Sequence, residues 1–89
     1  MINEDVKKQT AERLKKVEGQ VKGIQRMIEG EKYCIDIVNQ ITAVRRALDQ
    51  VALMVMKRHV ETCVSEAIKL GNSTVKIEEL MDTINRFVK

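Results

Sequence analysis

The chain has 89 residues, of which 44% are hydrophobic and 33% charged, and 16 Lys and Arg against 13 Asp and Glu give a formal charge of +3. Its length suits a single domain over residues 1–89, and its apolar content without any proline excludes a disordered chain. The longest apolar run, residues 51–56, is far shorter than the roughly 20 residues of a membrane span. No secretory leader is visible, so we expect a cytoplasmic protein without a membrane partner.

Three segments with helical periodicity follow one another without strand-like alternation, so the sequence predicts an all-α fold with three helices. The first helix is expected over about residues 4–29, with Asn3 as its N-cap. Its apolar stripe consists of Leu14, Val17, Val21, Ile24 and Ile28. Gly19 and Gly23 inside this segment lower helix propensity, which predicts that another helix approaches closely there.

Gly30 separates the first helix from a second, very long one that is expected over about residues 33–70. This segment contains no Gly or Pro, and as a helix it would be roughly 57 Å long. Its apolar stripe consists of Val38, Ile41, Val44, Leu48, Val51, Val55 and Met56. After the breaker cluster at residues 71–74, a third, amphipathic helix is expected over about residues 74–88. Its apolar residues are Ile77, Leu80, Met81, Ile84 and Phe87.

The short link around Gly30 predicts that the first helix folds back antiparallel along the second. A two-helix layer of this kind buries only a stripe, and Tyr33 and Phe87 are the only aromatic residues that could add bulk. We therefore expect the monomer to be incomplete. Two such hairpins can close an antiparallel four-helix bundle in a symmetric homodimer.

The candidate metal ligands are Cys34, His59 and Cys63, which are the two cysteines and the single histidine of the chain. His59 and Cys63 are four residues apart, so a helix places them on one face. Cys34 would lie roughly 37 Å from His59 along an unbroken helix, too far to join them in the same chain. In an antiparallel dimer, however, Cys34 of one subunit can meet the other two ligands of its partner, which gives two sites per dimer.

Two thiolates and one imidazole form a soft set of three ligands that suits Cu(I), whereas a structural Zn(II) site ordinarily takes four. Zinc and nickel remain open, because an oxygen of Asp36, Glu61 or Glu66 could complete the coordination. The alternative is that the cysteines are small buried hydrophobic residues and the histidine an ordinary polar residue of a long helix.

Basic residues offer a means of binding phosphates, although the sequence contains no helix-turn-helix, zinc-finger or basic-zipper motif. Those off the apolar stripe of the first helix are Lys7, Lys8, Arg13, Lys15, Lys16, Lys22 and Arg26. Arg45 and Arg46 stand together on the second helix. Each of these residues can equally belong to an ordinary solvated face. No nucleophile or glycine-rich motif is present, so we do not expect an enzyme.

Three segments resemble motifs of the copper-sensitive operon repressor (CsoR) family of bacterial all-helical regulators, and the resemblance covers essentially the whole chain. The segments are RLKKVEGQVKGIQRMIE at residues 13–29, YCIDIVNQITAVRRAL at residues 33–48 and HVETC at residues 59–63. The resemblance implies a disc-shaped homotetramer, a dimer of dimers, that represses by binding operator DNA and releases the DNA when its sensor site is filled.

The resemblance also implies what the site senses. Relatives with Cys, His and Cys at the positions of Cys34, His59 and Cys63 are Cu(I) sensors, which implies one Cu(I) per subunit across the dimer interface and control of copper-homeostasis genes. Tyr33 and Glu79 match positions whose hydrogen bonds couple the ligand region to DNA release. Nickel and cobalt sensors often carry an N-terminal histidine, which this chain lacks.

For DNA, the resemblance points first to Arg13, which matches a basic position that the family uses on DNA. Lys16, Arg45 and Arg46 are further candidates. Gln50 departs from the family pattern, because its position is usually basic, and Arg46 one turn away could replace it.

Two other functions remain open. In the first, a repressor of the same fold responds to thiol chemistry, with Cys34 and Cys63 as an intersubunit pair that is oxidised or bridged by persulfide. Persulfide-sensing relatives lack the histidine that this chain has at position 59. In the second, the chain is a helical oligomerisation module that binds neither metal nor DNA.

Overall fold

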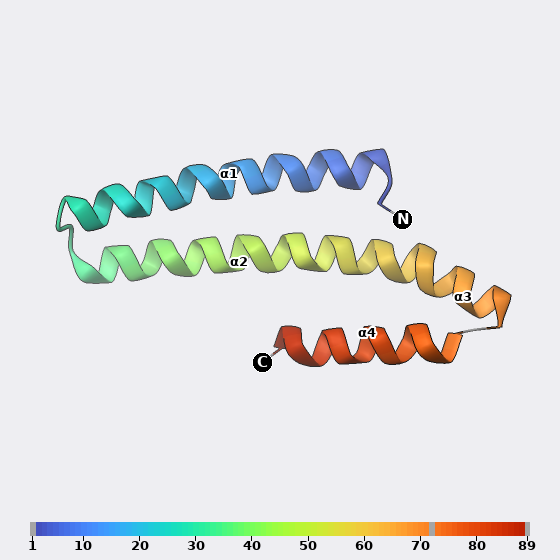
Figure 1. Ribbon diagram of the computed structural model, residues 1–89. Coiled ribbons are helices and arrows are strands. Elements are labelled where there is room, and N and C mark those ends of the chain that lie inside the picture. Colours follow the sequence, from blue (N-terminus) through green and yellow to red (C-terminus); the bar gives the residue numbers. More distant parts are fainter. Residues whose placement is uncertain (1, 72, 89) are drawn as a thin grey trace. The chain divides into compact units, whose positions relative to one another are not determined.

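The computed structural model describes residues 2–71 and 73–88, and most of these residues are helical (Figure 1). Helix α1 covers Glu4–Glu29, α2 covers Cys34–His59, the π-helical turn η1 covers Val60–Val64, α3 covers Ser65–Leu70 and α4 covers Ser73–Val88. No strand occurs in these two described ranges. The predicted all-α class is confirmed. Asn72, part of the predicted breaker cluster, lies outside the described residues.

The helices follow the predicted segments closely. Helix α1 has the predicted bounds, and α4 begins one residue before the predicted start. The predicted long helix corresponds to α2, η1 and α3, which follow one another without an intervening loop. The π-helical turn within this stretch is a feature that the apolar spacing does not reveal.

The chain divides into two compact units, one over residues 2–55 and one from Met56 onward. The first unit contains α1 and most of α2. Helix α1 begins where the sequence predicts, because the side-chain oxygen of Asn3 accepts a hydrogen bond of 2.8 Å from the amide of Val6. Glu4 and Asp5 place negative charge in the first turn, which complements the helix dipole.

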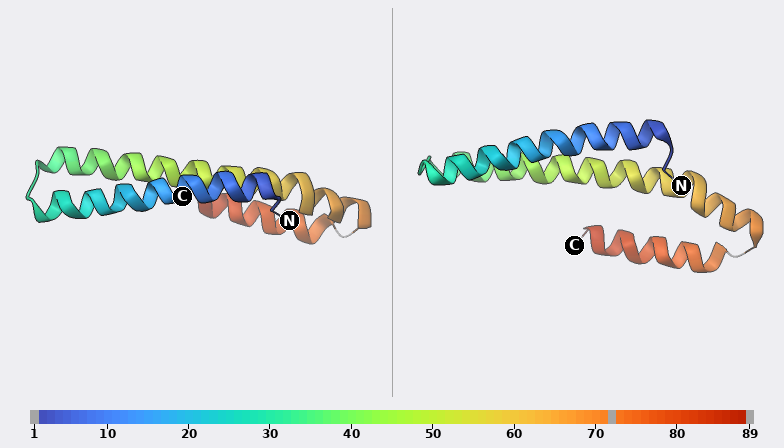
Figure 2. Two further views of the ribbon diagram at one scale, coloured as in Figure 1. Left: turned by 90° about the horizontal axis from the view of Figure 1, so that it is seen from above. Right: turned by 45° about the horizontal axis from the view of Figure 1, so that its top comes forward.

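Within the first unit, α1 and α2 run antiparallel and side by side (Figures 1 and 2). The link is tight: the amide of Gly30 donates to the carbonyl of Arg26 at 2.9 Å, and the amide of Lys32 donates to that of Met27 at 3.0 Å. The left-handed residue of the link is Glu31, with φ of 52°, and not the glycine. The predicted reversal of the chain is therefore present.

Few side chains of the first unit are buried. The buried residues are Thr10, Val17, Val44 and Val51. Much of the rest of the apolar stripe stays open to solvent: six of its residues are between 41% and 58% exposed, namely Leu14, Val21, Ile28, Val38, Ile41 and Leu48. The first unit thus does not cover much of its apolar surface with its own residues, as expected for half of a helical bundle.

The predicted close helix approach at Gly19 and Gly23 is wrong within the chain. A Cβ atom at Gly19 would meet no atom within 4 Å, and one at Gly23 would meet only the flexible end of Arg26 at 4.0 Å. Gly23 instead borders a groove on the surface of the first unit, so no neighbouring backbone comes near it.

In the second unit, α4 packs against α3 and η1. The chain leaves α3 at Gly71, whose φ of 82° is left-handed and whose amide donates to the carbonyl of Ile68 at 3.2 Å. This is the glycine C-cap that commonly ends a helix. Val64 and Ala67 are the buried hydrophobic residues of this unit. Among the described helices, none has a stretch long and apolar enough to cross a lipid bilayer.

Candidate metal centre and basic groove

The three candidate ligands lie on the stretch from α2 to η1, with Cys34 far along the chain from the other two. Cys34 is the first residue of α2, belongs to the first unit and is an exposed free thiol. His59 is the last residue of the same 26-residue helix, and the rise between them is roughly 37 Å in an α-helix. Tyr33 precedes Cys34 in the link and is 69% exposed.

His59 and Cys63 lie in the second unit, where both are half-buried. Cys63 is in η1, the π-helical turn that directly follows His59. A π-helical turn takes more residues than an α-helical one, so residues four apart stay on one face of it. Turns of this type occur frequently at functional sites. The predicted pairing of the histidine and the cysteine on one face is compatible with this backbone.

The described part of the chain does not place a third candidate ligand beside His59 and Cys63. Across residues 2–71 and 73–88, no group of three His, Cys, Asp or Glu side chains is placed to hold a metal ion. Among these described residues, Glu61 and Glu66 therefore do not complete a site with His59 of α2 and Cys63 of η1. The carboxylate of Glu61 lies 3.7 Å from the guanidinium of Arg58 and 4.0 Å from the ammonium of Lys57.

The sulfur of Cys63 has a polar neighbour that the sequence pattern does not single out. The hydroxyl of Thr62 lies 3.7 Å from this sulfur and donates a hydrogen bond of 2.8 Å to the carbonyl of Arg58. One turn later, the hydroxyl of Ser65 donates to the carbonyl of Val60 at 3.2 Å. The hydroxyls of Thr62 and Ser65, one on each side of Cys63 in the sequence, therefore both bond backbone carbonyls that precede this candidate ligand.

Glu79 is exposed on α4 in the second unit. Its backbone carbonyl accepts a hydrogen bond of 2.9 Å from the hydroxyl of Thr83. In the part of the chain that the structure describes, no hydrogen bond joins the Glu79 carboxylate to His59.

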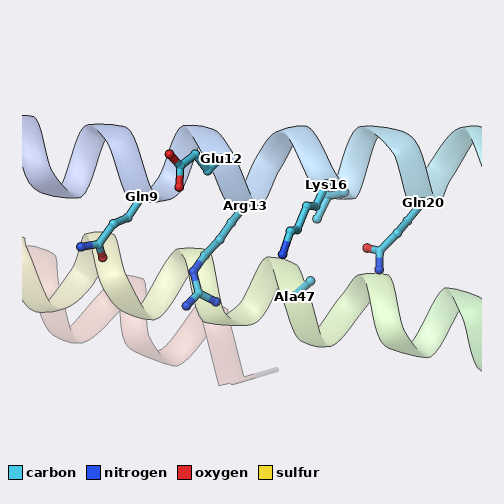
Figure 3. Close-up of a pocket in the computed structure, with 7 residues that line it drawn as sticks. Gln9, Glu12, Arg13, Lys16, Gln20 and Ala47 are labelled. Carbon is cyan, nitrogen blue, oxygen red and sulfur yellow. The ribbon is translucent and has the colours of Figure 1, made fainter.

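A groove of about 410 Å³ lies between α1 and α2 in the first unit (Figure 3). Figure 3 shows Arg13 and Lys16 extending from α1 toward α2, with Gln9 and Gln20 on either side of them. The lining residues are Gln9, Glu12, Arg13, Lys16, Val17, Gln20 and Ala47. Two of the predicted DNA contacts, Arg13 and Lys16, thus share one groove.

The cations of this groove are not neutralised by ion pairs. Among the described residues, the ion pairs involve Lys57, Arg58 and Glu61 of the second unit, and none involves a basic residue of α1. The two glutamines beside the cations lie four residues before Arg13 and four after Lys16, so helical spacing could have identified them. They were not predicted.

The two basic residues predicted on α2 do not take part in this groove. Arg45 and Arg46 are exposed, as is Gln50, and none of them is among the lining residues. The only lining residue from α2 is Ala47, whose small side chain leaves space between the helices.

Comparison with known proteins places the chain in a family. Residues 6–86 match a family model described as metal-sensitive transcriptional repressor. The copper-sensing transcriptional repressor CsoR of Bacillus subtilis is 47% identical over 83 residues, which cover 93% of this chain and 82% of the relative. The copper-sensing transcriptional repressor RicR of Mycobacterium tuberculosis is 47% identical over 81 residues, which cover 89% and 84% of the two chains.

Solved structures agree with this result. The copper-sensing repressor CsoR with Cu(I) from Geobacillus thermodenitrificans superposes with a TM-score of 0.92 at 42% identity, covering 100% of this chain and 93% of that one. The nickel-responsive transcriptional regulator InrS superposes with a TM-score of 0.78 at 31% identity, covering 90% of each chain. The resemblance drawn from the sequence motifs is confirmed, and the chain belongs to the metal-sensitive transcriptional repressor family.

Proposed function

We propose that this chain is a Cu(I)-responsive transcriptional repressor of the cytoplasm, which binds operator DNA in its metal-free form and releases the DNA when Cu(I) is bound. The observation that carries the proposal is the ligand set of two thiols and one imidazole, in a chain that is 47% identical to two copper-sensing repressors. The protein is a regulator and not an enzyme. The nickel-responsive relative is less similar, at 31% identity.

The metal site is formed between two protomers, with Cys34 from one and His59 and Cys63 from its partner. Two observations support this arrangement. Within the described residues, no single chain supplies a group of three ligands, and Cys34 is exposed at the start of α2. Thiolate and imidazole donors fit Cu(I), which accepts three soft ligands. The dimer then has two equivalent sites, and each site binds one Cu(I), which gives one Cu(I) per subunit.

The dimer buries the apolar surface that one chain leaves open. The exposed apolar residues of α1 and α2 repeat at helical spacing, as in a bundle that lacks its other half. An isologous interface between two α1–α2 hairpins covers this surface and places the start of one α2 beside the far part of the other. Two dimers then assemble into the tetramer that binds DNA.

Operator DNA is held mainly through its phosphates. Arg13 and Lys16 in the groove are the primary contacts, and Arg45 and Arg46 extend the basic surface along α2. Each chain carries a formal charge of +3, so a tetramer carries about +12, which favours binding through counterion release. Phosphate contacts position the protein on the duplex, and DNA shape contributes to sequence preference.

Metal binding and DNA binding oppose each other through the helices that carry the ligands. When Cys34 of one protomer and the ligands of its partner close around the metal, α2 and α4 shift against the partner and the basic grooves lose their register with the duplex. Tyr33 and Glu79 contribute by hydrogen bonding near the ligands. The coupling is reciprocal, and a 100-fold loss of DNA affinity corresponds to about 2.7 kcal/mol.

The test is an anaerobic titration of Cu(I) into the reduced protein on its own upstream DNA, with a competing chelator and fluorescence anisotropy as the readout. We expect release at one Cu(I) per subunit, and no release from Cys34→Ala or Cys63→Ala. Release by a persulfide donor but not by Cu(I) would instead support the thiol-responsive repressor. Failure to bind any duplex at low salt would support the oligomerisation module.

A further inference from the structure

The hydroxyl of Thr62 is in an unusual position among the threonines of the chain. Four threonines donate a hydrogen bond to the carbonyl four residues earlier, at distances between 2.8 and 3.1 Å: Thr10, Thr42, Thr62 and Thr83. This back-bonding is ordinary for threonine in a helix. Of these four, Thr62 is the one whose hydroxyl also lies within hydrogen-bonding distance of a sulfur, at 3.7 Å from Cys63.

The hydroxyl has one proton to share between two neighbours. Its 2.8 Å distance to the carbonyl of Arg58 is typical of an O–H···O hydrogen bond. The sulfur of Cys63 is the more distant of the two neighbours, at 3.7 Å, so the hydroxyl proton is directed mainly to the carbonyl in the metal-free protein.

A metal-bound sulfur changes this arrangement, because the thiolate is the form that ligates a metal and it has no proton to donate. If the Thr62 hydroxyl continued to donate to the carbonyl of Arg58, the lone pairs of the hydroxyl oxygen would face those of the sulfur. Rotation of the hydroxyl about its C–O bond turns the proton to the sulfur and removes this repulsion.

We propose that Thr62 is a positioning residue of the metal site, whose hydroxyl donates to the carbonyl of Arg58 in the metal-free protein and to the sulfur of Cys63 in the metal-bound protein. The inference rests on the proposed function, through the role of Cys63 as a ligand. The hydrogen bond stabilises the bound thiolate and fixes the direction of its remaining lone pairs.

The same rotation changes the hydrogen bonding of the backbone, because the hydroxyl no longer donates to the carbonyl of Arg58. Arg58 immediately precedes His59, at the junction between α2 and the π-helical turn η1. Rotation of the hydroxyl removes one hydrogen bond from the Arg58 carbonyl at this junction when the site is filled. Thr62 thereby connects the occupancy of one ligand to the backbone that carries the other.

The experiment compares full-length variants under anaerobic conditions. Thr62→Val removes the hydroxyl and nearly retains the shape of the side chain. Thr62→Ala also removes the hydroxyl, and alanine has a higher helix propensity than threonine. Thr62→Ser retains the hydroxyl. Thr42→Val is the matched control, because it removes the same type of back-bond from α2 with no cysteine sulfur bonded to its hydroxyl. The measurements are Cu(I) affinity by chelator competition, the ultraviolet thiolate-to-copper absorption band, and DNA affinity of the metal-free protein.

We expect both hydroxyl-free variants at position 62 to lose roughly 10- to 100-fold in Cu(I) affinity and to shift the absorption band, as is usual when a partner of a metal ligand is removed. Thr62→Ser and Thr42→Val should match the wild-type protein, and all variants should bind DNA equally without metal. Wild-type affinity and an unshifted band in Thr62→Val or Thr62→Ala would overturn the inference.

An equal loss of affinity in Thr42→Val, or no rescue by Thr62→Ser, would also overturn it, because the effect would then belong to helix stability. The proposed function fails in a different way, namely when the wild-type protein itself binds no Cu(I) or keeps its DNA at saturating Cu(I).

Discussion

Arg13 is the single residue on which DNA binding depends most in this account. Its side chain extends into the groove beside Lys16 (Figure 3), and it forms no ion pair among the described residues. We expect Arg13→Ala to weaken binding to specific and non-specific duplexes alike. The slope of the logarithm of the binding constant against the logarithm of the salt concentration should fall by the value of about one phosphate contact for each protomer that touches DNA. Anisotropy titrations at several salt concentrations measure both effects.

The matched control for this variant is Lys15→Ala, because Lys15 is a neighbouring cation of α1 that does not line the groove. Its loss should reduce DNA affinity much less. Cu(I) affinity should be unchanged in both variants. An equal effect of the two substitutions, or lost Cu(I) binding in Arg13→Ala, would contradict the assignment of the groove to DNA.

At the residue level, the sequence predicts the types of the candidate ligands better than their surroundings. Cys34, His59 and Cys63 stand out because the chain contains only two cysteines and one histidine. The hydroxyl of Thr62 could not be predicted, because its distance from the sulfur depends on a rotamer and on the local backbone. The neighbours of Arg13 could have been predicted, since Gln9 lies one helical turn away.

At the level of elements, apolar spacing and the positions of glycine predict nearly all helix bounds. They do not predict η1, because a π-helical turn keeps the apolar face and needs no glycine or proline. They also do not predict that Glu31 takes the left-handed conformation beside Gly30. Such local choices depend on how the ends of two helices meet, which the sequence pattern does not encode.

Gly71 is a turn at which the backbone does require glycine. Its φ of 82° is left-handed, and a Cβ atom there would meet no other atom within 4 Å, so a substitution is opposed by conformation and not by space. We expect Gly71→Ala to lower the free energy of unfolding by about 1–2 kcal/mol. Gly71→Asn should cost less, because asparagine tolerates this conformation better.

Urea unfolding followed by circular dichroism, at one fixed protein concentration, measures these differences. Equal stability of the wild-type protein and the alanine variant would contradict the requirement for glycine. A larger loss for asparagine than for alanine would contradict the conformational explanation.

At the level of the whole molecule, the proposed dimer supplies the third ligand of each site and covers apolar residues that are exposed in the first unit, so that one chain alone is incomplete. Helical periodicity predicts this incompleteness, since α1 and α2 carry apolar residues beyond those that they bury together. The sequence cannot supply the interface itself, because the relative placement of two chains depends on shape and not on periodicity.

The measurement that tests the central claim most directly is complementation between two inactive variants, Cys34→Ala and Cys63→Ala. Each homodimer lacks one thiolate in both of its sites. After equal amounts are mixed and allowed to exchange subunits, half of the dimers combine the two chains, and each of these has one complete site. Anaerobic Cu(I) titration against a chelator should then recover about one quarter of a high-affinity site per chain. Recovery of none after verified exchange, or wild-type Cu(I) affinity in either variant alone, would contradict a metal site shared between protomers.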